Sequence, residues 1–324
     1  MKTNYMISTN LNPFIKRLDR FVPNGYVDAV KLDKAIIMSG KIEGINGLEF
    51  LYPVHFKEPK KIKKLMENAG LKTSCVQVDL FIDKKWKFGS LSSMDTKIRK
   101  KAIELSKCSM DISAELGANR ILLWLGHDGY DYTFQTDYYK AWDNLINSLS
   151  EIANYRSDVK VSIEYKIREP RTRSFLSNMG TTLVAIKEVN KPNLGVIIDI
   201  GHSFMACENV AEMALLAHRH DALHGFHLND CFGYSDDDLI LGTVHFWEYI
   251  ELFYWMSQIG YNDWWTLDIY PYREDGVRAI EKSLKIFHTL MSIAKKLNIQ
   301  KIRALQLKSD ALAVFDLLID ASLT

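Results

Sequence analysis

Short apolar runs and longer amphipathic stretches alternate along the whole chain of 324 residues. The apolar runs are rich in β-branched and aromatic residues, whereas the stretches between them repeat their apolar positions at helical spacing. Eight strands are predicted in this way, at residues 4–8, 47–53, 72–79, 120–125, 160–164, 194–199, 222–227 and 264–268. Eight helices are predicted between and after them, at residues 27–41, 60–69, 96–116, 138–155, 181–189, 210–218, 246–259 and 276–297.

This alternation predicts a single α/β domain over residues 1–297, folded as a (β/α)8 TIM barrel with the parallel sheet inside and the helices outside. The composition does not change along these repeats, which argues against a domain boundary within them. A doubly wound open sheet is the alternative fold. No Gly-x-Gly-x-x-Gly follows the first predicted strand, so nucleotide binding in such a sheet has no sequence support.

Residues 298–324 form a short C-terminal extension beyond the eighth predicted helix. The stretch 311–319 is too apolar for a free tail in water. We therefore expect the extension to pack on the barrel or on a neighbouring subunit, and we expect a homo-oligomer, either a dimer or a tetramer.

Composition and charge narrow the possible partners. The 41 basic residues against 40 acidic ones give a net charge of +1, which provides no electrostatic footprint for nucleic acid or an anionic membrane. The N-terminus lacks an apolar signal core, and no run approaches the ~18 apolar residues of a membrane span. The four cysteines form no C-x-x-C pair, a pattern typical of reduced thiols. These features predict a cytoplasmic protein.

Four predicted strands in the second half of the chain end in an acid or a histidine: Glu164, Asp199, His227 and Asp268. The carboxyl ends of barrel strands meet at one mouth, so these side chains should converge. Carboxylates at the ends of buried strands are costly unless something positive pairs with them. The pattern therefore predicts a divalent metal site.

A second polar group lies close to the first. His202 follows Asp199 by three residues, and Asp236 and Asp238 lie in the loop after the seventh strand, where alternation turns both to the same side. With Asp199 shared, these residues predict a second ion site. Five ligand carboxylates, two divalent ions and Lys166 leave the cavity nearly neutral. Oxygen-rich sites with one imidazole per ion favour Mn²⁺, Mg²⁺ or Co²⁺.

Two segments resemble xylose isomerases. Residues 164–171 read Glu-Tyr-Lys-Ile-Arg-Glu-Pro-Arg, similar to the E-x-K-x-x-E-P segment of that family, and residues 120–130 look like its strand-four W-G-G-R-E-G segment. The Asp-x-x-His and Asp-x-Asp pairs fall where that family binds its second ion, and the similarity spans the whole barrel. The resemblance implies a two-metal aldose–ketose isomerase that acts on a monosaccharide by a hydride shift.

The same resemblance implies roles for individual residues. It places Lys166 at the carbonyl oxygen of the substrate, Trp124 on the wall of the sugar pocket, and His202 beside the substrate as well as at the second ion. His55 follows the second predicted strand, where the family has the histidine that opens the sugar ring. Glu58 would orient the His55 imidazole.

The sequence departs from xylose isomerases at two ligands. Asp199 stands in place of a glutamate and His227 in place of a carboxylate, which looks more like L-rhamnose isomerases and smaller xylose isomerase-like proteins. The identity of the sugar therefore stays open.

Other activities on the same barrel are alternatives. A ketose 3-epimerase, or a related sugar phosphate isomerase, would transfer a proton with Glu164 and the last ligand, Asp268, as catalytic acid and base. An abasic-site endonuclease would need three zinc ions and a basic DNA-binding face, which the balanced charge disfavours. A sugar-binding barrel without activity is the last alternative.

Overall fold

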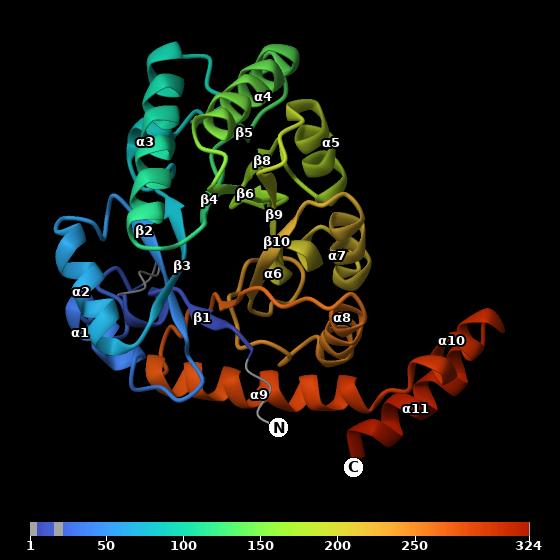
Figure 1. The fold of residues 1–324 in the computed structure, drawn as a ribbon. Coiled ribbons are helices and arrows are strands. Elements are labelled where there is room, and N and C mark those ends of the chain that lie inside the picture. Colours follow the sequence, from blue (N-terminus) through green and yellow to red (C-terminus); the bar gives the residue numbers. More distant parts are fainter. Residues whose placement is uncertain (1–4, 16–21, 324) are drawn as a thin grey trace.

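The computed structural model describes residues 5–15 and 22–323. Its centre is a closed barrel of eight strands, each parallel to its neighbours (Figure 1). In order around the barrel these are β1 (Ile7–Thr9), β11 (Trp265–Leu267), β10 (Leu223–Leu228), β9 (Leu194–Asp199), β6 (Lys160–Glu164), β4 (Arg120–Trp124), β3 (Lys72–Val78) and β2 (Gly47–Tyr52). The predicted (β/α)8 barrel is confirmed.

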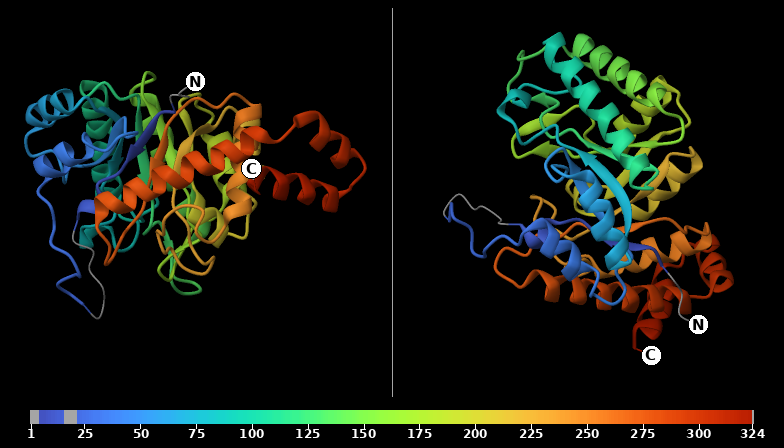
Figure 2. Two further views of the ribbon diagram at one scale, coloured as in Figure 1. Left: turned by 90° about the horizontal axis from the view of Figure 1, so that it is seen from below. Right: turned by 60° about the vertical axis from the view of Figure 1, so that its left-hand side comes forward.

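Helices surround the barrel on its outside (Figures 1 and 2). They are α1 (Leu32–Ser39), α2 (Pro59–Ala69), α3 (Thr96–Glu115), α4 (Tyr138–Tyr155), α5 (Met179–Val189), α7 (Val210–Arg219), α8 (Phe246–Gln258) and α9 (Gly276–Lys296). Side-chain caps fix where several of them begin. Asp95, Asp137 and Asp275 each accept a hydrogen bond from a backbone N–H in the first turn of α3, α4 and α9.

The first elements begin later than the sequence pattern predicts. β1 begins at Ile7, and Asn4, where the first strand was predicted to begin, lies outside the described residues. The first helix begins at Leu32 instead of residue 27. The backbone N–H of Val30 donates to the carbonyl of Phe14 at 2.9 Å, so this segment pairs with the chain after β1 and does not form a helical turn.

Several short elements in the loops were not predicted. They are η1 (Asn12–Phe14), η2 (Lys84–Trp86), α6 (Ile200–Met205) and a small antiparallel sheet of β5 (Gly129–Tyr130), β8 (Thr172–Ser174) and β7 (Arg168–Glu169). Each of them lies in a loop that follows the carboxyl end of a barrel strand. They therefore build up the mouth of the barrel.

Side chains fill the interior of the barrel. One layer is formed by Cys75, Leu122 and Ile197. At the amino-terminal end, the buried Arg120 donates to the backbone carbonyl of His224 and to both carboxylate oxygens of Asp263, at 2.6 and 2.7 Å. The ion pair offsets the cost of burying the guanidinium. It ties β4 to β10 and to the residues just before β11.

The C-terminal extension forms a helical hairpin of α10 (Ile299–Leu307) and α11 (Ala311–Leu323) that projects from the side of the barrel (Figures 1 and 2). Phe315 of α11 meets Trp247 of α8 edge to face, with ring centroids 6.4 Å apart. Leu312 and Leu323 are each 81% exposed, so the hairpin leaves apolar surface uncovered. No helix in the described residues is both long and apolar enough to cross a membrane.

Candidate metal and substrate site

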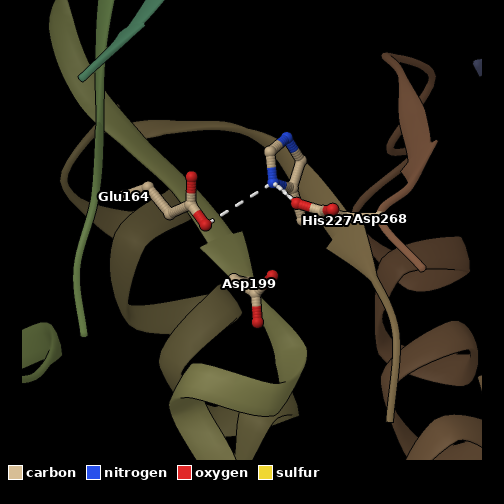
Figure 3. A group of neighbouring side chains, drawn as sticks. All are labelled: Glu164, Asp199, His227 and Asp268. Carbon is tan, nitrogen blue, oxygen red and sulfur yellow. Dashed lines mark ion pairs between the residues drawn. The ribbon is translucent and has the colours of Figure 1, made fainter. Parts of the chain in front are cut away.

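The four strand-end residues converge at the mouth of the barrel. One ligand atom from each of Glu164, Asp199, His227 and Asp268 lies within 4.8 Å of the others (Figure 3). Strand register explains the convergence, because Asp199 pairs directly with His227 between β9 and β10. We call these four residues the first group.

His227 lies between carboxylates on both sides of its ring. Its Nδ1 is 2.9 Å from Oδ2 of Asp268 and 3.6 Å from Oε1 of Glu164 (Figure 3). Its Nε2 lies 3.2 Å from Oε2 of Glu49, a buried residue in the middle of β2. The ring therefore presents Nδ1 to the first group and Nε2 to Glu49.

Asp268 is held by both of its oxygens. Its Oδ1 accepts hydrogen bonds from the side-chain amides of Asn10 and Asn12, the latter at 2.8 Å, and its Oδ2 faces His227. Donors to a carboxylate favour its charged form. Burial would raise the pKa of Asp268, but the adjacent imidazolium of His227 keeps that pKa below the usual value.

A second group shares Asp199 with the first. It contains Asp199, His202 and Asp236, whose ligand atoms also lie within 4.8 Å of one another. Asp199 caps α6 by accepting the backbone N–H of His202 at 2.9 Å, and this turn brings the imidazole back over the strand end. Nε2 of His202 lies 3.2 Å from Oδ2 of Asp236.

Asp238 lies near the second group but is not one of the three gathered residues. It lines the same cavity as Asp236, while its carboxylate lies 3.4 Å from the side-chain amide of Asn229. Asp237 turns into its own loop, where it accepts hydrogen bonds from the backbone of Phe232 and from Ser235. The expected separation of Asp237 from its two neighbours is therefore present, although the segment is a loop and not a strand.

Lys166 lies beside the second group. Its Nζ donates to Oδ2 of Asp236 at 2.7 Å and also pairs with Glu169. The ammonium lies 5.3 Å from the ring centroid of Trp124, which Phe81 contacts edge to face at 4.7 Å. Lys166 and Trp124, two residues expected from the sequence, thus face one another in the cavity.

The carboxylates of the two groups strongly perturb the neighbouring histidines. Burial disfavours the charged imidazole of His202, but Asp199 and Asp236 raise its pKa to about 9. Burial acts in the same way on His227, and Glu49 and Glu164 raise its pKa well above the usual value. The two groups therefore retain protons on their histidines as a source of positive charge.

The pKa values of Asp199 and Asp236 are shifted in opposite directions. Burial raises the pKa of Asp199 to about 7, against the lowering effect of His202. Asp236 is also buried, yet His202 and Lys166 hold its pKa well below the usual range. The ion pairs of Asp236 thus decide its charge.

These residues fit a divalent cation by their donor chemistry. Nδ1 of His202, Nδ1 of His227 and Oδ1 of Asp236 are buried without a well-aligned hydrogen bond from any described residue. Buried polar atoms of this kind usually have a partner, and a coordinated ion would provide one. Carboxylates with one imidazole per group match the ligand preferences of Mg²⁺ and Mn²⁺.

His55 lies at the edge of the same cavity, but its partner differs from the prediction. Its Nδ1 accepts the backbone N–H of Leu51 at 3.0 Å, so Nε2 carries the proton of the neutral ring, and burial lowers the pKa to about 4. Glu58 does not orient the imidazole. It is the residue just before α2, where its side chain is 71% exposed and pairs with Lys61 at 3.8 Å.

The groups open into a cavity of about 450 Å³, within the usual size of small-molecule sites. Glu49, Asn10 and Asn12 line this cavity and were not identified from the sequence. Their positions in the sequence do not identify their partners, because Glu49 contacts His227 and the two asparagines contact Asp268, all far along the chain. Their importance depends on partners far along the chain.

The fold and the two groups define the class of protein: a (β/α)8 barrel with a candidate metal centre at the carboxyl ends of its strands. The chain belongs to the xylose isomerase-like TIM barrel family, whose model matches residues 41–303. The predicted family is confirmed.

Two relatives illustrate the similarity in sequence. A xylose isomerase from Thermus thermophilus is 28% identical over 232 residues, which cover 69% of this chain and 60% of that protein. A probable sugar isomerase from Mesorhizobium japonicum is 25% identical over 221 residues, covering 66% of this chain and 50% of the relative. The chain therefore spans less than two thirds of the length of either relative.

Solved structures show the same fold. A D-tagatose 3-epimerase-like protein superimposes with a TM-score of 0.66 at 20% identity, covering 87% of this chain and 98% of that one. D-Psicose 3-epimerase from Clostridium cellulolyticum gives a TM-score of 0.69 at 16% identity and covers 88% and 99%. At these identities the likeness establishes the fold alone.

Proposed function

We propose that this protein is a divalent-metal-dependent sugar isomerase that interconverts an aldose and a ketose. The observation that carries the proposal is the pair of adjacent groups that share Asp199, because a single-metal epimerase has no use for the second group. The names of the relatives in sequence support an isomerase. The proposed substrate is a monosaccharide, which a cavity of about 450 Å³ can hold.

Two ions are proposed, Mn²⁺, Mg²⁺ or Co²⁺. Glu164, Asp199, His227 and Asp268 would hold the first ion, and Asp199, His202 and Asp236, with Asp238 at the edge, would hold the second. When bound, the ions supply Lewis-acid polarisation of the adjacent oxygens of an open-chain sugar.

The side chains of the protein would prepare the substrate for transfer between its first two carbons. The Lys166 ammonium places positive charge beside the oxygen that becomes negative. Trp124 forms an apolar wall that keeps water away. His55 can donate from Nε2 to a ring oxygen, because Leu51 fixes its tautomer. A hydride then moves between C2 and C1 while the proton of the C2 hydroxyl moves to the C1 oxygen.

Asp268 supports hydride transfer over proton transfer. As the base of an epimerase it would need an oxygen free to accept a proton from carbon. Oδ1 accepts from Asn10 and Asn12, and Oδ2 faces the first group beside His227, where a bound ion would take it. We therefore propose that Asp268 acts as a ligand and that it does not transfer a proton.

The test is a panel of aldoses and ketoses incubated with Mn²⁺ or Mg²⁺ in deuterated water, with the products analysed by NMR and mass spectrometry. We expect aldose–ketose conversion that EDTA removes, with no solvent deuterium bound to carbon in the product. Stoichiometric deuterium at the reacting carbon would instead indicate proton transfer and favour the ketose 3-epimerase. Absence of activity with every sugar, together with absence of bound metal, would contradict an isomerase.

We also propose that the hairpin of α10 and α11, in the extension (298–324) that follows the barrel domain (1–297), contacts a second copy of this chain. α10 carries the basic Lys301 and Arg303, and α11 carries the acidic Asp316 and Asp320. A twofold arrangement would place the basic helix of one copy beside the acidic helix of the other and cover the exposed leucines. Sedimentation equilibrium should give a dimer or tetramer. A monomer at all concentrations would contradict this.

A cytoplasmic location stays a prediction from composition.

A further inference from the structure

Glu49 is the one acid of β2 (Gly47–Tyr52), and it is only 3% exposed. Its neighbours in the strand, Leu48 and Phe50, are fully buried apolar residues. A carboxylate in such surroundings is costly unless a partner compensates for the loss of water. Its hydrogen-bond partner among the described residues is Nε2 of His227, at 3.2 Å.

The two residues meet across the interior of the barrel. β2 and β10 are separated by β1 and β11 in the order of the strands, so the contact is not one between adjacent strands. Glu49 also lines the cavity onto which the carboxylates of the two groups face. β2 contributes no residue to the first group. Through Glu49 it nevertheless contacts the imidazole of that group.

We propose that Glu49 is a positioning residue that fixes the ring orientation and tautomer of His227 for metal binding. Oε2 of Glu49 lies 3.2 Å from Nε2 and can accept a hydrogen bond there, so it selects the form of the neutral ring with the proton on Nε2. Nδ1 then keeps its lone pair, and it points at Glu164 and Asp268, 3.6 and 2.9 Å away. The inference rests on the proposed metal site.

Removal of Glu49 would release both constraints. The neutral ring could then carry its proton on Nδ1, or rotate and present Nε2, and either change costs affinity for the ion. Carboxylates that orient a ligating histidine typically contribute 10–100-fold to metal affinity. A merely structural Glu49 would instead change the stability of the metal-free fold and leave metal affinity unchanged.

The test measures Co²⁺ affinity by competition with a chelator for the full-length chain and its variants. Glu49→Ala should weaken binding by about 10–100-fold. Glu49→Gln should restore most of the affinity, because its amide oxygen still accepts from Nε2. Ser162→Ala is the matched control. It removes a 3.0 Å hydrogen bond to the buried His224, three residues earlier on β10, and should leave affinity unchanged.

A second readout needs no substitution at Glu49. In the wild-type protein loaded with diamagnetic Zn²⁺, ¹⁵N NMR of labelled histidines should show His227 with its proton on Nε2, assigned by loss of the signal in His227→Gln. A proton on Nδ1, or equal Co²⁺ affinity of wild type and Glu49→Ala, would overturn the inference while leaving the proposed function intact. Failure of the wild type to bind Co²⁺ would overturn both.

Discussion

His202 provides a quantitative test of how strongly the two groups hold positive charge without a metal. Its pKa rises from 6.5 in the unfolded chain to about 9 in the folded one, because Asp199 and Asp236 outweigh the effect of burial. The imidazolium therefore stabilises the folded chain. This contribution is fully present below pH 6.5 and is lost as the pH rises through 9.

The size of the effect follows from the shift. At about 1.4 kcal/mol per pKa unit, the contribution of His202 is about 3 kcal/mol. A chain of this length unfolds with an entropy of about 0.7 kcal/mol/K, so the melting temperature should fall by about 4 °C. Replacing His202 by asparagine should remove this part of the pH dependence.

The assay is thermal unfolding in EDTA between pH 6 and pH 10, read by differential scanning calorimetry. For each protein the melting temperature is plotted against pH, and the slope for wild type is compared with the slope for His202→Asn. His220→Asn is the control, because His220 is exposed at the end of α7 and outside both groups. Equal slopes for wild type and His202→Asn, or a wild type that gains relative stability as the pH rises, would refute the reasoning. Saturating Mn²⁺ should reverse the trend, since a metal binds the neutral ring.

Three substitutions test the other parts of the structure. Lys166→Met should lower kcat by about 100-fold or more, because it removes the positive charge beside the reacting oxygen; steady-state rates near those of wild type would contradict its proposed role. Trp124→Ala should raise KM roughly tenfold through the loss of the apolar wall, with a smaller change in kcat; an unchanged KM would exclude Trp124 from the sugar pocket. Arg120→Met should lower the free energy of unfolding by about 3 kcal/mol, because Asp263 loses its bidentate partner and retains only the more distant Lys160 as a cationic partner, at 3.5 Å; urea denaturation at an unchanged midpoint would show that the pair contributes little.

Much of the fold could be predicted because the strands are buried on both faces and the helices on one. That pattern can be recognised within short stretches of sequence, and all eight barrel strands follow it. The segment before α1 was predicted to be helical because its apolar residues have helical spacing. In the structure the backbone N–H of Val30 instead donates to the backbone carbonyl of Phe14. The spacing of apolar residues gives no information about a backbone contact of this kind. The same is true of α6, which depends on the Asp199 cap.

The site divides in a similar way. Residues at strand ends, such as Glu164 and Asp268, could be placed because the barrel fixes where strand ends meet. Glu58 was assigned wrongly, since spacing alone could not show that the backbone of Leu51 would take the ring nitrogen of His55. Glu49 was missed because its partner lies 178 residues away on a strand that is not its neighbour.

Asp199 belongs to both groups, and this sets it apart from every other ligand when residues are substituted in evolution. A lineage can lose Asp236 or His202 and retain four intact ligands in the first group. The loss of Asp199 removes a ligand from both groups at once. A single substitution outside Asp199 can therefore leave one group complete and reduce two ions to one, whereas a substitution of Asp199 breaks both groups.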